Sequence, residues 1–361
     1  MAERHPRARR VLVAVILGLG GVGAVGAGAS AVPVTSPSPD GGGRVVVRFA
    51  DPDITESSGL VVVDGDLVTV NDSGGAPVIY SVDAVTGETV ATTRFAPSQT
   101  DVEALAPVAD DRGAVWVADI GNNDGSRSVI TVTRVAVDGT SDLGSATSYD
   151  LSYPGGDAPD AEALLCDPRT GRLYVVTKAI LGGTVYAAPA RLHAGGPNRL
   201  RPVGRVGSVI TDGAFWPDGR HVLLRNYGQL EVYSFPALDL VATVPLPDQE
   251  QGEALAVDGD GSLLLTSEGE HAAVLRVQLP ARVRALLDAR PASSAAPSES
   301  ESPSAASAPS SPSAPPAVDG DEQSAPADDR LLSTIMWLLL GGVVVAGGLL
   351  VVMFRRWYPS E

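Results

Sequence analysis

The sequence predicts an all-β fold built from one repeated unit. Three observations support this prediction: the apolar runs are short and rich in Val, Leu and Thr, Gly-containing turns recur roughly every ten residues, and one pattern occurs five times. Each copy of the pattern consists of an acidic lead, a short apolar strand, a Gly-containing turn, a second apolar strand and a polar end. The copies cover residues 54–75, 100–123, 159–180, 210–230 and 250–270.

A third strand follows each copy, and most copies have room for a fourth. When the copies are aligned on their first apolar strand, one residue of each falls into a common column. These residues are 45, 59, 50 and 41 residues apart, close to the period of a four-stranded propeller blade. The sequence therefore predicts a five-bladed β-propeller over residues 44–290. We call the aligned residues the axial column: Ser58, Glu103, Glu162, Asp212 and Glu253.

The last copy contains only three strands, whereas a single strand is expected at residues 43–52, before the first copy. We expect this N-terminal strand to complete the last blade, because the ring then has no open edge. A six-bladed ring is the alternative, with additional strands hidden in residues 144–160.

Both ends of the chain carry membrane signals. Residues 1–31 combine basic residues, an apolar stretch and a small-x-small triplet, which predicts an export signal peptide followed by a linker at 32–43. An uncleaved anchor is the alternative at this end. Residues 331–354 would span roughly 36 Å as a helix, enough to cross a hydrocarbon core of about 30 Å. The two arginines that follow predict that residues 355–361 lie in the cytoplasm.

Residues 291–330 consist mostly of Pro, Ala, Ser and acidic residues. Such a segment has too little apolar surface to offset the entropy of ordering, so we expect a disordered stalk. The sequence thus predicts a single-pass protein of the cell membrane whose propeller lies outside the cytoplasm. The formal charge of −17, without a basic stripe in the propeller, argues against nucleic acid as a partner. The chain has one cysteine, so no disulfide forms within it.

Acidic residues gather where the first strand of each blade begins. In a propeller this strand lines the central channel, and residues two apart point the same way. Asp101 with Glu103, and Asp160 with Glu162, are therefore expected to point at the axis as pairs. The metal-ligand candidates are Glu56, Asp101, Glu103, Asp160, Glu162, Asp212 and Glu253.

Two interpretations of these acids stay open. Converging carboxylates in a partly dehydrated channel repel one another unless a cation neutralises them, and calcium accepts six to eight oxygen ligands in irregular geometry. Alternatively, the acids bind backbone N–H groups between blades. Further polar residues at the ends of the second strands are the ligand-binding candidates: Asp72, Asp119, Asn122, Arg225, Asn226 and Glu268.

Lys178 is the only lysine of the chain and aligns with Asp72 and Asp119. It is expected to pair with Asp160 or Glu162, or to act on a substrate. The catalytic candidates are Glu103, Glu162 and Lys178.

The segments "EALLCDPRTGRLYVVTK" and "GEALAVDGDGSLLLTSEG" resemble secreted bacterial β-propellers of the wide group that includes NHL-type, phytase-like and calcium-dependent lactonase or phosphotriesterase propellers. The resemblance covers residues 44–290. It implies calcium on the channel axis, held by residues that correspond to Glu56, Glu103, Glu162, Asp212 and Glu253. Propellers of this group usually have six blades, one more than the pattern of this chain predicts.

Three functions are compatible with this sequence. The first, which we favour, is a membrane-anchored module that binds a small molecule, a glycan or a protein outside the cytoplasm. The alternative is a calcium-dependent hydrolase of an ester, lactone, phosphoester or glycoside, with Glu103 or Glu162 as base. A purely structural envelope protein is the third.

Overall fold

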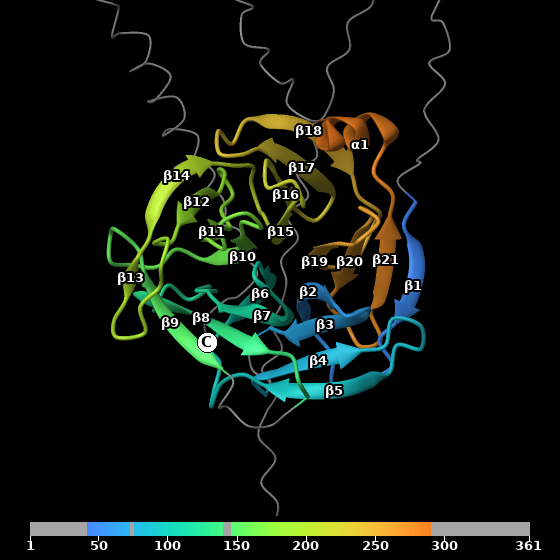
Figure 1. Cartoon of the computed structure of the whole chain (residues 1–361), viewed down its shortest axis with the longest axis horizontal. Helices are drawn as coiled ribbons and strands as arrows, with labels where there is room; N and C mark the ends of the chain where they lie inside the picture. The colour runs from blue at the N-terminus through green and yellow to red at the C-terminus, as the bar shows by residue number, and fades with distance from the viewer. Residues whose placement is uncertain (1–41, 73–75, 140–145, 290–361) are drawn as a thin grey trace, which may run out of the picture. The chain divides into compact units, whose positions relative to one another are not determined.

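The computed structural model describes residues 42–72, 76–139 and 146–289. These residues form five sheets arranged as blades around a common centre (Figure 1). The prediction of a five-bladed β-propeller is confirmed.

Each blade begins at the centre and ends at the periphery of the ring (Figure 1). Blade 1 consists of β2 (Ser57–Val63), β3 (Asp66–Asn71), β4 (Val78–Val82) and β5 (Thr89–Arg94). Blade 2 consists of β6 (Val102–Val108), β7 (Asp111–Asp119), β8 (Val129–Ala136), β9 (Thr147–Ser152) and the short β13 (Asn198–Arg199), which is parallel to β9. Blade 3 consists of β10 (Ala161–Cys166), β11 (Leu173–Thr177), β12 (Thr184–Ala187) and β14 (Arg201–Arg205).

The last two blades complete the ring. Blade 4 consists of β15 (Asp212–Phe215), β16 (His221–Arg225), β17 (Gln229–Ser234) and β18 (Leu240–Pro245). Blade 5 consists of β19 (Gly252–Val257), β20 (Leu263–Ser267), β21 (Ala273–Val277) and β1 (Arg44–Arg48).

The N-terminal strand closes the ring, as predicted. β1 pairs antiparallel with β21, from Arg44 opposite Arg276 to Arg48 opposite Ala273. The six-bladed alternative is wrong, because the described part of residues 144–160 supplies only β9, the fourth strand of blade 2. Closure by the N-terminal strand covers the edge that β21 would otherwise expose.

The inner strands β2, β6, β10, β15 and β19 each contact the inner strands of both neighbouring blades. Gly59 in β2 is packed so tightly that a Cβ there would overlap the backbone of Leu105 in β6. Five clusters of buried hydrophobic residues lie one between each pair of neighbouring blades. The short apolar runs of the sequence are the strands that supply these clusters.

One element was not predicted from the sequence. The helix α1 (Ala281–Asp288) follows β21 and begins directly after Pro280, its N-cap residue. Its residues Val283 and Leu287 are buried in the cluster between blades 4 and 5. The helix has only eight residues and two buried positions. Its sequence therefore shows too little helical periodicity to be distinguished from the end of a strand.

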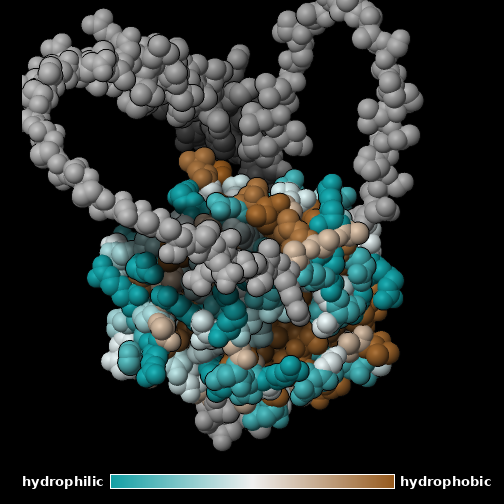
Figure 2. Space-filling view, turned by 45° about the horizontal axis from the view of Figure 1, so that its top comes forward, coloured by the Kyte–Doolittle hydropathy of each residue, from teal (hydrophilic) through white to brown (hydrophobic). Residues whose placement is uncertain are grey.

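The surface in Figure 2 is largely hydrophilic, with smaller hydrophobic areas between the polar ones. No helix among the described residues is long and apolar enough to cross a membrane. The predicted signal peptide (1–31), stalk (291–330), transmembrane segment (331–354) and tail (355–361) lie outside the described residues.

Candidate functional site

The axial column lies at one end of the central channel. Each of its residues is the first or second residue of an inner strand, so the five blades bring them to the same level. All are at most 5% exposed: Ser58, Glu103, Glu162, Asp212 and Glu253. Four acids and a serine are therefore enclosed together, although carboxylates are rarely buried without partners.

A β-bulge orients the column residue in four of the blades. In blades 1, 2 and 3 the residue left without a cross-strand partner is Ser58, Glu103 or Glu162, respectively. In blade 5 the unpaired residues are Glu253 and Ala254. A bulge turns its extra residue out of the regular alternation, which aims that side chain at the channel. In blade 4 the inner strand pairs with β16 without a bulge, and Asp212 is paired directly with Arg225.

Glu103 is the residue that two groups of carboxylates share. In one group its oxygen lies within 4.8 Å of oxygens of Asp72 and Asp101, and in the other within 4.8 Å of oxygens of Asp160 and Glu162. We call these five residues the carboxylate cluster. They come from blades 1, 2 and 3, so the cluster lies to one side of the channel axis rather than around it.

No hydrogen bond or ion pair of the Glu103 carboxylate is found among the described residues, although this residue is only 5% exposed. Burial raises the pKa of Glu103 to about 11, and the neighbouring carboxylates, led by Glu162 and Asp72, add to the rise. Such a group needs either a proton or a cation at neutral pH.

Gly121 makes room for the cluster. It follows β7, and a Cβ at this position would lie 2.5 Å from carboxylate oxygens of both Asp101 and Glu103. The Gly121 N–H donates to the Asp101 carbonyl at 3.0 Å. Only glycine leaves the space into which these two side chains turn, so residue 121 is part of the site that sequence analysis missed.

The structure also corrects the sequence alignment at this point. Asp119 was aligned with Asp72 and Lys178, but its cross-strand position matches Asn71 of blade 1 and Thr177 of blade 3. The backbone N–H of Gly121 donates to the Asp101 carbonyl, and those of Asp72 and Lys178 make the equivalent hydrogen bonds in their own blades. Gly121, not Asp119, therefore corresponds to Asp72 and Lys178. Blade 2 has one extra residue here, which a spacing argument does not reveal.

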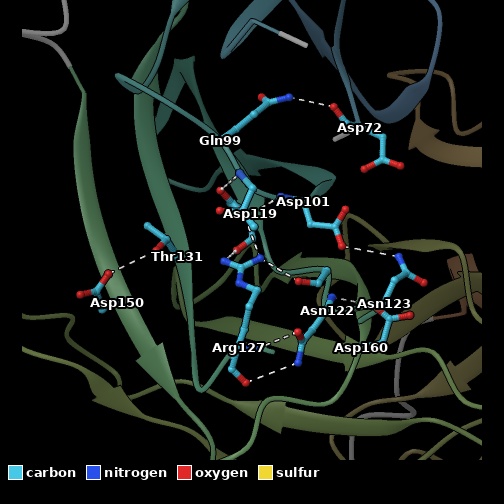
Figure 3. A network of polar contacts seen from close by, with 12 residues as sticks. Asp72, Gln99, Asp101, Asp119, Asn122, Asn123, Arg127, Thr131, Asp150 and Asp160 are labelled. Carbon is cyan, nitrogen blue, oxygen red and sulfur yellow. Dashed lines mark hydrogen bonds and ion pairs between the residues drawn. The ribbon is translucent and has the colours of Figure 1, made fainter. Parts of the chain in front are cut away.

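Asp119 and Arg127 hold the loops around the cluster (Figure 3). The Asp119 carboxylate accepts from the backbone N–H groups of Thr100 at 2.9 Å and Asp101 at 3.0 Å. Arg127 pairs with Asp119 at 2.8 Å and donates to the Gly121 carbonyl at 2.7 Å. The oxygens of Asp119, a predicted ligand-binding residue, are thus engaged by the scaffold.

Two asparagines contact the cluster directly (Figure 3). The backbone N–H of Asn122 donates to Asp160 Oδ1 at 2.8 Å, while the buried Asn122 side chain donates to the Ala158 carbonyl. Asn123 Nδ2 donates to Asp101 Oδ2 at 3.5 Å. Asn122 therefore positions Asp160, and the exposed Asn123 reaches the cluster from outside.

Lys178 borders the cluster and neutralises part of the column. Its Nζ donates to Glu162 Oε1 at 2.9 Å and lies 5.6 Å from the centre of the Tyr227 ring. Burial opposes its charge, but the carboxylates of Glu162 and Glu253 outweigh burial and raise the pKa of Lys178. Of the interpretations from sequence, the pairing with Glu162 is the one that the geometry supports.

Arg225 is a second internal cation. It is fully buried between blades 4 and 5, where Nη1 donates to the Ala254 carbonyl at 3.0 Å and Nη2 to Gln249 Oε1 at 3.2 Å. Gly252 provides the space, because a Cβ there would overlap the guanidinium. Burial lowers the pKa of Arg225 to about 10, which leaves it charged at neutral pH. This predicted ligand-binding residue lies inside the fold.

The remaining candidates lie outside the cluster. Asp212 is fully buried, and its Oδ2 accepts from the Leu255 N–H at 2.7 Å. The Glu268 carboxylate accepts a hydrogen bond from the Gln251 side chain, and the backbone of Glu268 forms a β-bridge with that of Glu56. Asn226 accepts from two backbone N–H groups of the β16–β17 turn. Glu253 has a pKa raised to about 7 by burial, with Lys178 acting against the rise.

The channel changes character below the axial column. An apolar cavity of about 240 Å³ is lined by the following stretch of all five inner strands, including Leu60, Leu105, Leu164, Phe215 and Leu255. The acids thus rest on an apolar floor, which disfavours their charged forms.

The fold and the site define the chain as a five-bladed β-propeller with buried carboxylates at one end of its channel. No protein-family model matches the sequence, and no curated protein matches it. Among solved structures, a luciferin-regenerating enzyme is similar with a TM-score of 0.40 and 14% identity, over 66% of this chain and 96% of that one. A gluconolactonase from Xanthomonas campestris has a TM-score of 0.40 and 17% identity, over 61% and 71% of the two chains.

Proposed function

We propose that the protein is a membrane-anchored binding module that holds a calcium ion in the carboxylate cluster and binds its ligand at the acidic end of the channel. The observation that carries this proposal is Glu103, a buried carboxylate shared by two carboxylate groups and lacking a partner among the described residues. A cation there would remove the repulsion that otherwise forces protons onto the cluster.

The donor set fits a hard cation. Each carboxylate group consists of Asp and Glu residues alone, and oxygen donors select Ca²⁺ or Mg²⁺ rather than the softer metals that prefer nitrogen and sulfur. Ligands from three blades cannot all shift to an ideal octahedron, so the irregular coordination of calcium is the better match. The space at Gly121 lets Asp101 and Glu103 approach together.

The internal cations decide which acids are available. Lys178 pairs with Glu162 and its charge acts on Glu253, and Arg225 lies near Asp212, whereas no lysine or arginine pairs with Glu103 or Asp160 among the described residues. Since Lys178 already pairs with Glu162 in the second group, we assign the calcium to the group of Asp72, Asp101 and Glu103, with Asp160 and Glu162 beside it. Lys178 and the half-exposed Tyr227 border this position and offer a positive charge and an aromatic ring to a ligand.

Hydrolysis is the second candidate function. Burial raises the pKa of Glu162 to about 8 and that of Glu253 to about 7, values that suit a general base near neutral pH. A bound calcium would polarise an ester, lactone, phosphoester or glycoside oxygen. Glu162 would then accept the proton of water, and Lys178 would hold Glu162 in place. Turnover that is lost in Glu162→Gln while calcium binding persists would favour this candidate over a binding module.

The test is a calcium titration of the full-length protein by calorimetry, with and without chelator. We expect one calcium per chain and a higher melting temperature with calcium, since a ligand that binds only the folded state stabilises it. Glu103→Gln should weaken binding at least about tenfold, the loss of one charged ligand. Glu231→Gln is the matched control, because it changes a partly buried acid on β17, outside the cluster, and should bind calcium as the wild type does.

Absence of calcium-dependent heat and an unchanged melt would overturn the calcium site. So would equal binding by wild type and Glu103→Gln.

The membrane anchor and the export signal belong to the same proposal and derive from residues 1–31 and 331–354 of the sequence. External protease added to intact cells should release the propeller by cutting the stalk. A propeller protected until the cells are lysed would contradict this topology.

A further inference from the structure

A cleft of about 450 Å³ lies between blades 2 and 3, away from the axial column. The β6–β7 turn, the outer part of blade 2 and the β10–β11 turn form it. Because β6 runs from Glu103 near its start to Val108 at its end, roughly 16 Å of strand separates the cleft from the carboxylate cluster. Its volume falls in the range of about 300 to 1,000 Å³ that is typical of small-molecule sites.

Two aromatic rings form one wall of the cleft. The Trp116 and Tyr149 ring centroids are 5.8 Å apart, at an interplanar angle of 55°. Trp116 is part of the buried cluster between blades 2 and 3, and Tyr149 packs against the same cluster, so both rings are fixed before a ligand arrives. Rigid aromatic rings offer a large apolar contact surface at little cost in conformational entropy.

A turn held in place by Asp167 supplies another part of the lining. This nearly buried carboxylate accepts from the Arg169 N–H at 2.9 Å and from the Thr170 hydroxyl at 2.8 Å. The Gly171 N–H donates to the Asp167 carbonyl at 2.8 Å. The turn therefore presents Arg169 and Thr170 at the rim of the cleft in a fixed conformation.

The rim carries charges of both signs. Arg134 pairs with Asp111 at 2.8 Å, and its side chain is 39% exposed. Arg169 is 48% exposed and lies 3.5 Å from Asp167, while the exposed Asp110 adds a further carboxylate. Because each guanidinium already has an acidic partner, the rim does not select a strong anion. It offers N–H donors and carboxylate acceptors side by side, which is the requirement of a hydroxyl group.

We propose that this cleft binds a neutral saccharide. The apolar face of a sugar ring rests on Tyr149 and Trp116, while its hydroxyls accept from Arg134 and Arg169 and donate to Asp110. The site is independent of the calcium site and stands whether or not the axial column holds a metal.

The test is calorimetry of the full-length protein with glucose, galactose, mannose, N-acetylglucosamine, maltose and cellobiose. We expect saturable binding of at least one sugar with a Kd below about 1 mM. Arg134→Ala should weaken it at least about tenfold, since a hydrogen bond to a charged group contributes about 1.5 to 3 kcal/mol. Tyr149→Ala should weaken it through loss of the ring contact.

Arg284→Ala is the matched control. This arginine is 38% exposed and pairs with Asp288 at 2.7 Å, so it matches Arg134 in exposure and partner but lies on α1. Arg284→Ala, Glu103→Gln and chelator should each leave sugar binding unchanged. The proposal is overturned if none of the sugars binds, if glucuronate binds in their place, or if Arg134→Ala binds as well as Arg284→Ala.

Discussion

Glu103 and Glu162 show how one neighbour decides the state of a buried acid. Both are column residues of adjacent blades, both are turned inward by a bulge, and both are at most 5% exposed. The blade of Glu162 places Lys178 where the blade of Glu103 has Gly121, as the equivalent backbone hydrogen bonds show. A lysine supplies an internal cation, whereas a glycine leaves space for an external one.

Gly121→Ala is therefore expected to weaken calcium binding at least about tenfold. The new methyl group would lie 2.5 Å from the Asp101 and Glu103 carboxylates, which must turn away from the position that the cation needs. Calorimetric titration measures the effect. Gly113→Ala on the same blade is the control, because its nearest neighbour would be 3.7 Å away. Equal affinities of the two variants would place the cation elsewhere in the channel.

At the level of elements, the ring depends on a strand from the far end of the sequence. β1 covers β21, and Val47 of β1 is buried with residues of blades 1 and 5. The blade that carries Glu253 thus needs residues that precede blade 1. Glu56 forms a β-bridge with Glu268 beside this junction. The contact that closes the ring therefore lies at the acidic end of the channel.

Deletion of residues 42–48 is expected to leave the edge of β21 unpaired and to open the contact between blades 1 and 5. An exposed, apolar edge strand promotes pairing between chains, so the shortened protein should form oligomers or aggregates and should melt at a lower temperature. Size-exclusion chromatography and thermal melting measure both effects. A deletion that ends at residue 41 retains β1 and is the control; identical behaviour of the two proteins would contradict a closing role for β1.

The number of strands and their order could be predicted because each blade repeats one local pattern of apolar runs and turns. The column of acids followed from the same pattern, since its residues occupy equivalent positions in the repeat. The bulges could not be predicted, because a bulge depends on the register between two strands and leaves the composition unchanged. The extra residue before Gly121 shifted the alignment at Asp119 for the same reason.

The distribution of charge over the whole propeller could not be predicted from the sequence either. Arg225 and Lys178 are both cationic residues near the ends of second strands, yet one is sealed between blades and the other faces the channel. Which acids each cation reaches depends on the neighbouring blade, because Arg225 extends from blade 4 to the Ala254 carbonyl of blade 5. The resulting asymmetry places the positive charges beside blades 3 to 5 and leaves the carboxylate cluster of blades 1 to 3 to a metal.

This asymmetry predicts how the stability of the calcium-free protein depends on pH. Burial raises the pKa of Glu162 to about 8 and those of Glu253 and Glu268 to about 7, above the ordinary value of about 4.3. Between about pH 5 and pH 8 the folded protein holds protons that the unfolded chain has lost, so stability falls as the pH rises. Each 1 kcal/mol lost should lower the melting temperature by about 2 to 4 °C.

Thermal melting in chelator at pH 5, 6, 7 and 8 measures this slope. The melting temperature is expected to fall by several degrees over the range. The fall should be smaller with saturating calcium, because a bound cation favours the charged carboxylates. Glu253→Gln should reduce the slope, since it removes a group that titrates in this window. Glu103→Gln should reduce the slope in chelator over the whole range, because burial raises the pKa of Glu103 to about 11 and the folded protein keeps there a proton that the unfolded chain has lost. A melting temperature that rises with pH in chelator would show instead that the column is charged without calcium, and that Lys178 and Arg225 suffice to balance it.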